Sequence, residues 1–179
     1  MLGSDARDSA RRMVAEVIAV ASEPFSQQLV INKGTLSGVY EGQPVLDSNG
    51  IIGQVQDVGG NTARVLLLSD QSHAISLRSE RNDIRVLAQG TGDIGRLELM
   101  FIPHSSDLQK GDLLMSSGLG GVFPEGYPVA RISSIVRDES LPFATVFADP
   151  VSALDRVRNV LLLWPSEGEQ QPIFDEDEG

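Results

Sequence analysis

Glycine and proline divide this chain into short apolar segments, and that division limits its possible folds more than any other feature. The 179 residues include eighteen Gly and nine Pro. The intervening segments are rich in Val, Ile and Leu and too short for helices, and turn residues recur about every eight to twelve positions. The segments with this pattern are Val17–Ala21, Gln28–Asn32, Gln43–Asp47, Ile51–Val58, Ala63–Leu68, Ala74–Arg78, Ile84–Ala88, Leu97–Phe101, Asp112–Ser116, Tyr127–Val136, Phe143–Ala148 and Val157–Trp164. About twelve short strands predict an all-β protein built from barrels or a sandwich.

Two turn-rich regions of the sequence resemble each other. Asn49-Gly50 between two apolar pairs predicts a two-residue hairpin turn, because both turn positions of that type need positive φ. When the chain is shifted by 69 residues, Val39–Leu46 falls on Leu108–Met115 with its apolar and Gly positions matched. This match indicates a duplicated barrel unit, or two unrelated hairpins that share turn chemistry.

Composition excludes several classes of protein. With 41% hydrophobic residues the chain can bury a core, so disorder of the whole chain is excluded. No apolar run exceeds five residues, and the charged start, Met1 to Glu16, has no signal-peptide pattern. There is no Cys, which excludes disulfides, iron–sulfur clusters and cysteine zinc sites.

Acidic charge is concentrated at the C-terminal end. The net charge is −11, and six acids without a base lie in Ser166 to Gly179, leaving −5 for the rest. We expect residues 166–179 to form a disordered acidic tail. An acidic body with only two Lys argues against nucleic acid as the main partner.

The first residues have a different pattern from the rest. Ser4 to Glu16 is rich in Ala and Arg, and Ser4 or Asp5 could cap a helix there. Few of its positions are apolar, so alone it would be a marginal helix. We therefore expect a short N-terminal helix remnant, the end of a longer helix.

A serine hydrolase is the enzyme that this sequence could encode, because chymotrypsin-like proteases also pair two six-stranded barrels. Ser117 would be the nucleophile, with His73 as base and Asp83 or Asp93 as the orienting carboxylate. Ser117-Gly118-Leu119-Gly120-Gly121 equally suits a flexible loop, and a shared fold carries no chemistry by itself. No zinc spacing links the two His, and no Lys-Ser or Lys-Thr follows the glycines, so we expect no metal and no nucleotide cofactor.

Aromatic residues in loops are the candidates for contact with partners. Phe123 and Tyr127 lie in a loop framed by Gly and Pro, and Phe25 follows Pro24. Large rigid rings on such loops make good interface anchors. The alternative is that Phe123 folds back and plugs one end of a barrel.

Three stretches resemble the MreC family of rod-shape-determining proteins from the bacterial cell envelope. The first is Pro24-Phe25 with Leu29 to Gly34, and the second is Gly38-Val39 with Gly42 to Asp47 and Gly50 to Val55. The third, Ser117 to Pro124 with Gly126 and Pro128-Val129, is the most specific. The similarity covers about Val17 to Trp164.

This resemblance implies a domain organisation. Family members have one membrane-spanning helix, a coiled coil and two small periplasmic β-barrels. Residues 1–16 would then be the end of the coiled coil or vector residues. The first barrel would comprise residues 17–71 with 151–165, and the second residues 72–150. The membrane helix itself is absent from this chain.

The resemblance also implies a function. The family is non-enzymatic and organises the cell-elongation machinery on the periplasmic side of the inner membrane. Its members self-associate and bind the elongation-specific penicillin-binding protein, a transpeptidase, together with other membrane proteins of elongation. We therefore expect a scaffold that uses no cofactor, with Phe25, Phe123 and Tyr127 as contact residues.

Overall fold

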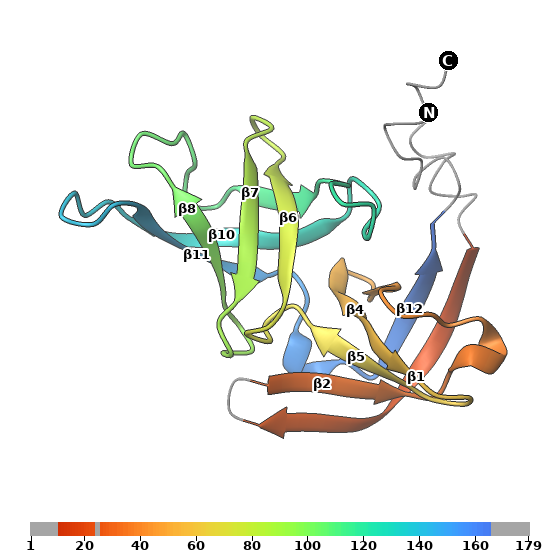
Figure 1. The fold of residues 1–179 in the computed structure, drawn as a ribbon. Coiled ribbons are helices and arrows are strands. Elements are labelled where there is room, and N and C mark those ends of the chain that lie inside the picture. Colours follow the sequence, from red (N-terminus) through yellow and green to blue (C-terminus); the bar gives the residue numbers. More distant parts are fainter. Residues whose placement is uncertain (1–10, 24–25, 166–179) are drawn as a thin grey trace, which may run out of the picture.

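The structure is a computed structural model that describes residues 11–23 and 26–165. Its strands are β1 (Arg11–Glu23), β2 (Ser26–Ile31), β3 (Pro44–Leu46), β4 (Ile51–Val58), β5 (Ala63–Leu67), β6 (Ala74–Ser79), β7 (Arg85–Gly90), β8 (Leu97–Ile102), β9 (Leu113–Ser116), β10 (Pro128–Val136), β11 (Ala144–Pro150) and β12 (Asn159–Trp164). Two short 3-10 turns, η1 (Thr35–Ser37) and η2 (Leu154–Arg156), interrupt them (Figure 1). The prediction of an all-β protein is confirmed. The predicted acidic tail and Phe25 lie outside the described residues.

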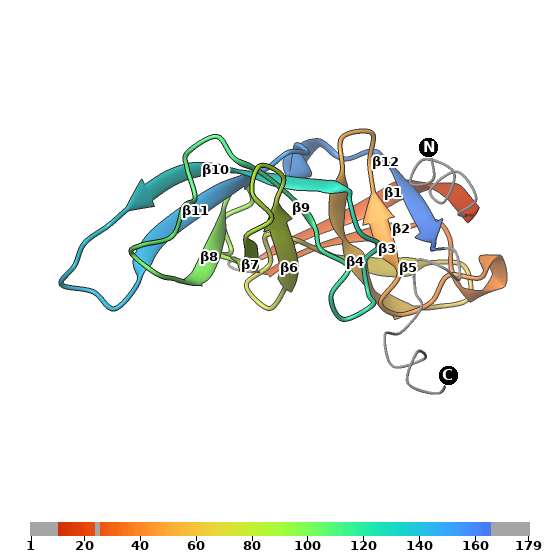
Figure 2. The same cartoon turned by 90° about the horizontal axis from the view of Figure 1, so that it is seen from above.

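The strands close into two antiparallel barrels of six strands each. The first has the order β1-β12-β3-β4-β5-β2 and the second β10-β11-β8-β7-β6-β9. Strand β12 returns from the far end of the sequence to close the first barrel between β1 and β3. The two barrels lie side by side and give an elongated molecule (Figure 2).

Both barrels have the same strand connectivity once β12 is counted as the first strand of barrel 1. The strands of barrel 1 are then counted as β12, β1, β2, β3, β4 and β5, and those of barrel 2 as β6 to β11. In each barrel the first strand pairs with the second and the fourth. The third strand pairs with the second and the sixth, and the fifth strand lies between the fourth and the sixth. This correspondence places β3 on β9, as the 69-residue shift does, and β4 on β10, which begins at Pro128 and so lies beyond residues 120–127, where the shift alone would carry β4. The shared topology supports the interpretation of a duplicated unit.

The predicted helix at the start of the chain is wrong where it can be checked. Residues 11–16 form the first half of β1 and pair with β12, from Arg11 opposite Trp164 to Glu16 opposite Asn159. The Arg11 guanidinium also stacks over the Trp164 ring at 4.0 Å from its centroid. Pairing with β12 outweighs the helix propensity of Ala and Arg. The rest of that prediction, Ser4 to Ala10, lies outside the described residues.

The predicted turn at Asn49-Gly50 is a different kind of turn. Leu46 pairs with Ile51, so four residues connect β3 and β4, and neither Asn49 nor Gly50 has positive φ. The Asp47 carboxylate accepts hydrogen bonds from the amides of Asn49 and Gly50 and so closes the loop. Gly50 is required for another reason: a Cβ there would lie 2.2 Å from the Pro128 carbonyl oxygen of barrel 2.

Buried polar contacts join the two barrels. The backbone amide of Gln27 in β2 donates to Asp70 Oδ2 at 2.6 Å. The side-chain amide of Gln27 donates to the Gly92 carbonyl of barrel 2 at 2.7 Å. Ser69 donates from its hydroxyl to Gln27 Oε1. Asp70 and Gln27 are both buried, so these bonds are shielded from water. They fix the orientation of one barrel against the other.

Candidate functional site

The candidate hydrolase residues do not meet. The Ser117 hydroxyl lies 3.1 Å from that of Ser76 and accepts a bond from the Leu119 amide. The candidate orienting groups have other partners, since Asp83 forms an ion pair with Arg78 and Asp93 accepts a bond from the Gly95 amide. Among the described contacts, none joins Ser117 or either Asp to His73. A hydrolase based on these residues is therefore unsupported.

His73 has a structural environment. Its Nε2 lies 2.8 Å from Gln54 Oε1, which connects the start of β6 to β4 of the other barrel. Its ring packs edge-on against Phe123 with centroids 6.2 Å apart. Burial disfavours the imidazolium and lowers the pKa of His73 to about 4, against a weaker opposing effect of Asp70. A neutral, enclosed imidazole packs between the barrels and supports no proton transfer to a ligand.

Phe123 and Tyr127 are core residues in this structure. Their exposed fractions are 8% and 9%. The loop that carries them is closed by Ser116, whose hydroxyl donates to the Pro124 carbonyl and accepts from the Tyr127 amide. This arrangement favours the alternative in which Phe123 plugs a barrel end. Neither ring presents a surface to a partner here.

An exposed aromatic pair lies instead on the outer surface of barrel 2. The rings of Phe101 and Phe143 meet edge to face with centroids 5.6 Å apart. Their exposed fractions are 64% and 42%, and the half-exposed Leu87 lies beside Met100, its partner in the β7–β8 ladder. We call Leu87, Met100, Phe101 and Phe143 the aromatic patch. Patches of this kind mark interaction sites on soluble domains.

A β-bulge turns Phe101 outward. Leu99 pairs with Val146 and Ile102 with Ala144, so two residues of β8, Met100 and Phe101, oppose Thr145 alone. Phe101 has a φ of 58°, a left-handed conformation that a bulky residue rarely adopts. Simple alternation from Leu97 and Leu99 would place Phe101 inside, and for that reason sequence reasoning missed it. Such strain in the backbone is a feature of functional positions.

The loop next to the aromatic patch is held rigid. Arg137, directly after β10, donates to the carbonyls of His104 and Ser106 at 3.0 Å each. His104 Nε2 in turn lies 2.8 Å from the Leu141 carbonyl. These bonds tie the β10–β11 loop to the loop after β8, so little conformational entropy remains to be lost when a partner binds.

Among the described residues there is neither a metal-binding cluster nor a membrane-spanning helix. Within residues 11–23 and 26–165 no group of three or more His, Asp and Glu could hold a metal ion. The same residues form no helix that is long and apolar enough to cross a membrane.

Comparison with known proteins identifies the family. The family model described as rod shape-determining protein MreC, barrel core, matches residues 17–164. The chain belongs to the MreC family. The cell shape-determining protein MreC of Haemophilus influenzae is 51% identical over 166 residues, covering 93% of this chain and 47% of that protein. MreC of Escherichia coli K12 is 46% identical over 167 residues, covering 93% and 46%. The chain thus spans about half the length of these curated relatives.

Solved MreC structures share the fold. A crystal structure of MreC from Pseudomonas aeruginosa superposes with a TM-score of 0.82 at 48% identity, covering 85% of this chain and 98% of that one. A complex between penicillin-binding protein PBP2 and MreC from Helicobacter pylori contains a chain that matches with a TM-score of 0.69 at 18% identity, covering 88% and 99%. At that identity the second likeness concerns the fold alone.

Proposed function

We propose that this chain is a non-enzymatic docking module of the cell-elongation machinery, which binds the elongation-specific penicillin-binding protein on the periplasmic side of the inner membrane. Membership of a family of cell shape-determining proteins supports this role. The H. pylori relative, found in a complex with PBP2, supports the class of partner. Other membrane proteins of elongation would be further partners.

The exposed Phe101–Phe143 pair is the observation that carries the proposal. Two aromatic rings side by side offer large apolar area at low entropic cost, and aromatic anchors dominate interface energies. The bulge and the tied β10–β11 loop hold both rings in place before binding. We place the partner's apolar side chains against the aromatic patch. This assignment replaces Phe123 and Tyr127, whose rings are buried.

Self-association is a second part of the proposal, supported by the β1–β2 hairpin. Beyond Glu16, β1 pairs with β2 alone, so one edge of its second half is open among the described strands. Ile18 and Val20 are more than half exposed on this segment. Val17 to Ser22 of this segment carries no charged side chain and is rich in β-branched residues, and such an edge strand is a template for pairing with another chain. Sedimentation of Ile18→Ser with Val20→Ser against the unchanged chain tests it, and unchanged association would contradict it.

A cell-shape assay tests the docking function. Phe101→Ser with Phe143→Ser is introduced into the full-length protein that replaces the native copy in a rod-shaped bacterium. We expect rounded cells at normal protein levels, because the scaffold folds but no longer holds the transpeptidase. Leu36→Ser, an exposed leucine in η1 of barrel 1, is the control and should keep the rod shape. Rods with both phenylalanines replaced would contradict the proposal.

A further inference from the structure

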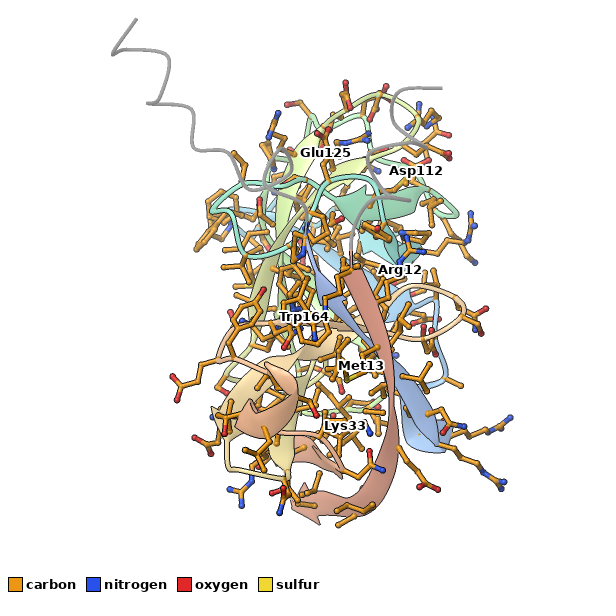
Figure 3. The ribbon with its side chains drawn as sticks, turned by 90° about the vertical axis from the view of Figure 1, so that its right-hand side faces the viewer. Arg12, Met13, Lys33, Asp112, Glu125 and Trp164 are labelled. Atoms are coloured by element: carbon orange, nitrogen blue, oxygen red, sulfur yellow. The ribbon has the colours of Figure 1, made fainter. Side chains whose placement is uncertain are left out.

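A groove in barrel 1 lies between the start of β12, the η2 turn and the β3–β4 loop. It has a volume of about 520 Å³. The strands β1 and β12 lie side by side in Figure 3, where Met13 marks β1 and Trp164 marks the end of β12. The groove reaches β1 at Val14, the residue after Met13. It belongs to barrel 1 and is separate from the aromatic patch of barrel 2.

One edge of β12 is unpaired along this groove. Strand β3 has only three residues and pairs with β12 at two positions, of which Leu46 opposite Leu161 is the last. After Leu46 the chain enters the β3–β4 loop. Asn159 and Val160 therefore pair with β1 but have no partner among the described strands on the side of β3. The open backbone groups of a strand edge can bind an added extended segment.

The wall of the groove is apolar. Val14 and Leu161, which pair across β1 and β12, line it together with Val157. Val14 is 63% exposed, so the described residues leave much of this apolar surface uncovered. An extended segment next to β12 would bury its own apolar side chains against these three residues, and such burial is favourable.

The rim of the groove carries positive charge in an otherwise acidic protein. Arg158 is exposed, and among the described residues its side chain has no hydrogen-bond or ion-pair partner. Arg156 meets only its neighbour Asp155, at 4.0 Å, and such an exposed pair is weak. Asp47, the acid in the lining, already accepts bonds from the Ser152 hydroxyl and from amides of its own loop. Both arginines therefore remain available to carboxylates of a ligand.

We propose that this groove binds an extended segment of a partner protein in which apolar residues are followed by acidic ones. The segment adds to β12 as a strand, and its apolar side chains pack against Val14 and Leu161. Its carboxylates face Arg156 and Arg158. Charge orients this partner, because the net charge without residues 166–179 is −5 and the rest of the surface repels an acidic segment. The site does not depend on docking through barrel 2, so the scaffold can hold a second protein at the same time.

Titration of the ¹⁵N-labelled full chain with short peptides tests the groove by NMR. The probe is a mixture of capped hexapeptides, each with three residues of Val, Ile or Leu followed by three of Asp or Glu. We expect saturable shifts of the backbone amides of Val14, Asn159 and Leu161, and the amide of Phe101 should not shift. A mixture with Lys in place of the acids should bind about tenfold more weakly. A mixture N-methylated at its apolar residues cannot donate backbone hydrogen bonds and should also bind more weakly.

Substitutions in the protein separate the effect of charge from that of the apolar wall. Arg156→Glu with Arg158→Glu should weaken binding of the acidic mixture by about tenfold. Val14→Ser should weaken it as well, because less apolar surface is buried. Arg64→Glu with Arg85→Glu makes the same change in net charge on exposed arginines of β5 and β7. This control should bind the mixture as the unchanged chain does.

Four results would overturn the proposal. The first is the absence of shifts at Val14 and Leu161 with the acidic mixture, and the second is equal binding by the chain with Arg156→Glu and Arg158→Glu. The third is a shift of the same amides when the peptide-free chain is diluted, which would make a second copy the occupant. The fourth is binding that appears only after the acids of residues 175–178 are replaced by Ser, which would make the chain's own C-terminal end the occupant.

Discussion

Gly42 and Gly111 hold the same left-handed backbone conformation at the same point of the two barrels, with φ of 88° and 94°. They are 69 positions apart. The Gly42 amide donates to the Val55 carbonyl and the Gly111 amide to the Ile132 carbonyl, both at 2.8 Å. In each barrel this bond joins the turn to the second strand of the hairpin that follows. The two turns are thus equivalent in conformation and in hydrogen bonding.

Substitution of these two glycines should have the same effect in both barrels. A Cβ at Gly42 or Gly111 meets no atom within 4 Å, so the cost arises from the backbone alone. We expect Gly42→Ala and Gly111→Ala each to lower the free energy of unfolding by about 1–2 kcal/mol. Gly60→Ala is the matched control, because that site is equally open but has no positive φ. Urea unfolding measures all three, and a clear difference between Gly42→Ala and Gly111→Ala would contradict the equivalence.

Removal of the Phe101 side chain should not destabilise barrel 2. Phe101→Gly relieves the left-handed strain of about 1–2 kcal/mol but adds backbone freedom to the unfolded chain and loses the contact with Phe143. Because these effects oppose each other, we expect a melting temperature within a few degrees of the unchanged protein. Differential scanning calorimetry checks this. A large fall would show that the ring supports the fold, and the docking assignment would lose its basis.

His73 should make the protein less stable in mild acid. Its pKa is about 4 in the folded protein and about 6.5 when unfolded, so only the unfolded chain takes up this proton as pH falls between those values. Proton uptake by His73 in the unfolded chain therefore lowers the free energy of unfolding by roughly 2 kcal/mol as the pH falls from 7 to 5. His73→Gln should flatten that part of the profile in urea unfolding. An unchanged slope in His73→Gln would show that the imidazole is not enclosed.

Asp70 should stabilise the junction between the two barrels, where its carboxylate accepts from the backbone amides of Gln27 and Ser72. Asp70→Ala removes the acceptor of the buried Gln27 amide, and we expect a loss of about 1–3 kcal/mol. Burial alone would raise the pKa of Asp70, but the bonds from Ser72 and Gln27 outweigh it and lower the pKa. The contribution of Asp70 is thus present above its unfolded pKa and is lost as pH falls through the lowered folded value. Asp93→Ala, an exposed turn residue, is the control in urea unfolding at pH 7, and an equal effect in both would contradict this role.

Much of the fold could be predicted from sequence, because Gly and Pro mark the turns and apolar residues alternate along the strands, and both signals are local. These signals predicted twelve strands and the match of Val39–Leu46 to Leu108–Met115. The strand at Arg11–Glu16 could not be predicted this way, because its partner β12 lies almost 150 residues away.

The candidate site was harder to predict than the fold. Phe123 and Tyr127 have loop sequences that suit an interface, but the hydrogen bonds of Ser116 fold that loop inward. The outward position of Phe101 depends on one extra residue in β8, and periodicity carries no signal for a bulge. Exposure of apolar residues on a barrel therefore has to be read from the register of its strands.

Direct binding to the periplasmic part of an elongation-specific penicillin-binding protein tests the central claim. Isothermal titration compares the unchanged chain with Phe101→Ser/Phe143→Ser, and calorimetric melting confirms that both are folded. We predict that the double substitution weakens binding at least tenfold, or about 1.4 kcal/mol, while the melting temperature changes little. Equal affinity of the two chains would contradict docking through the aromatic patch.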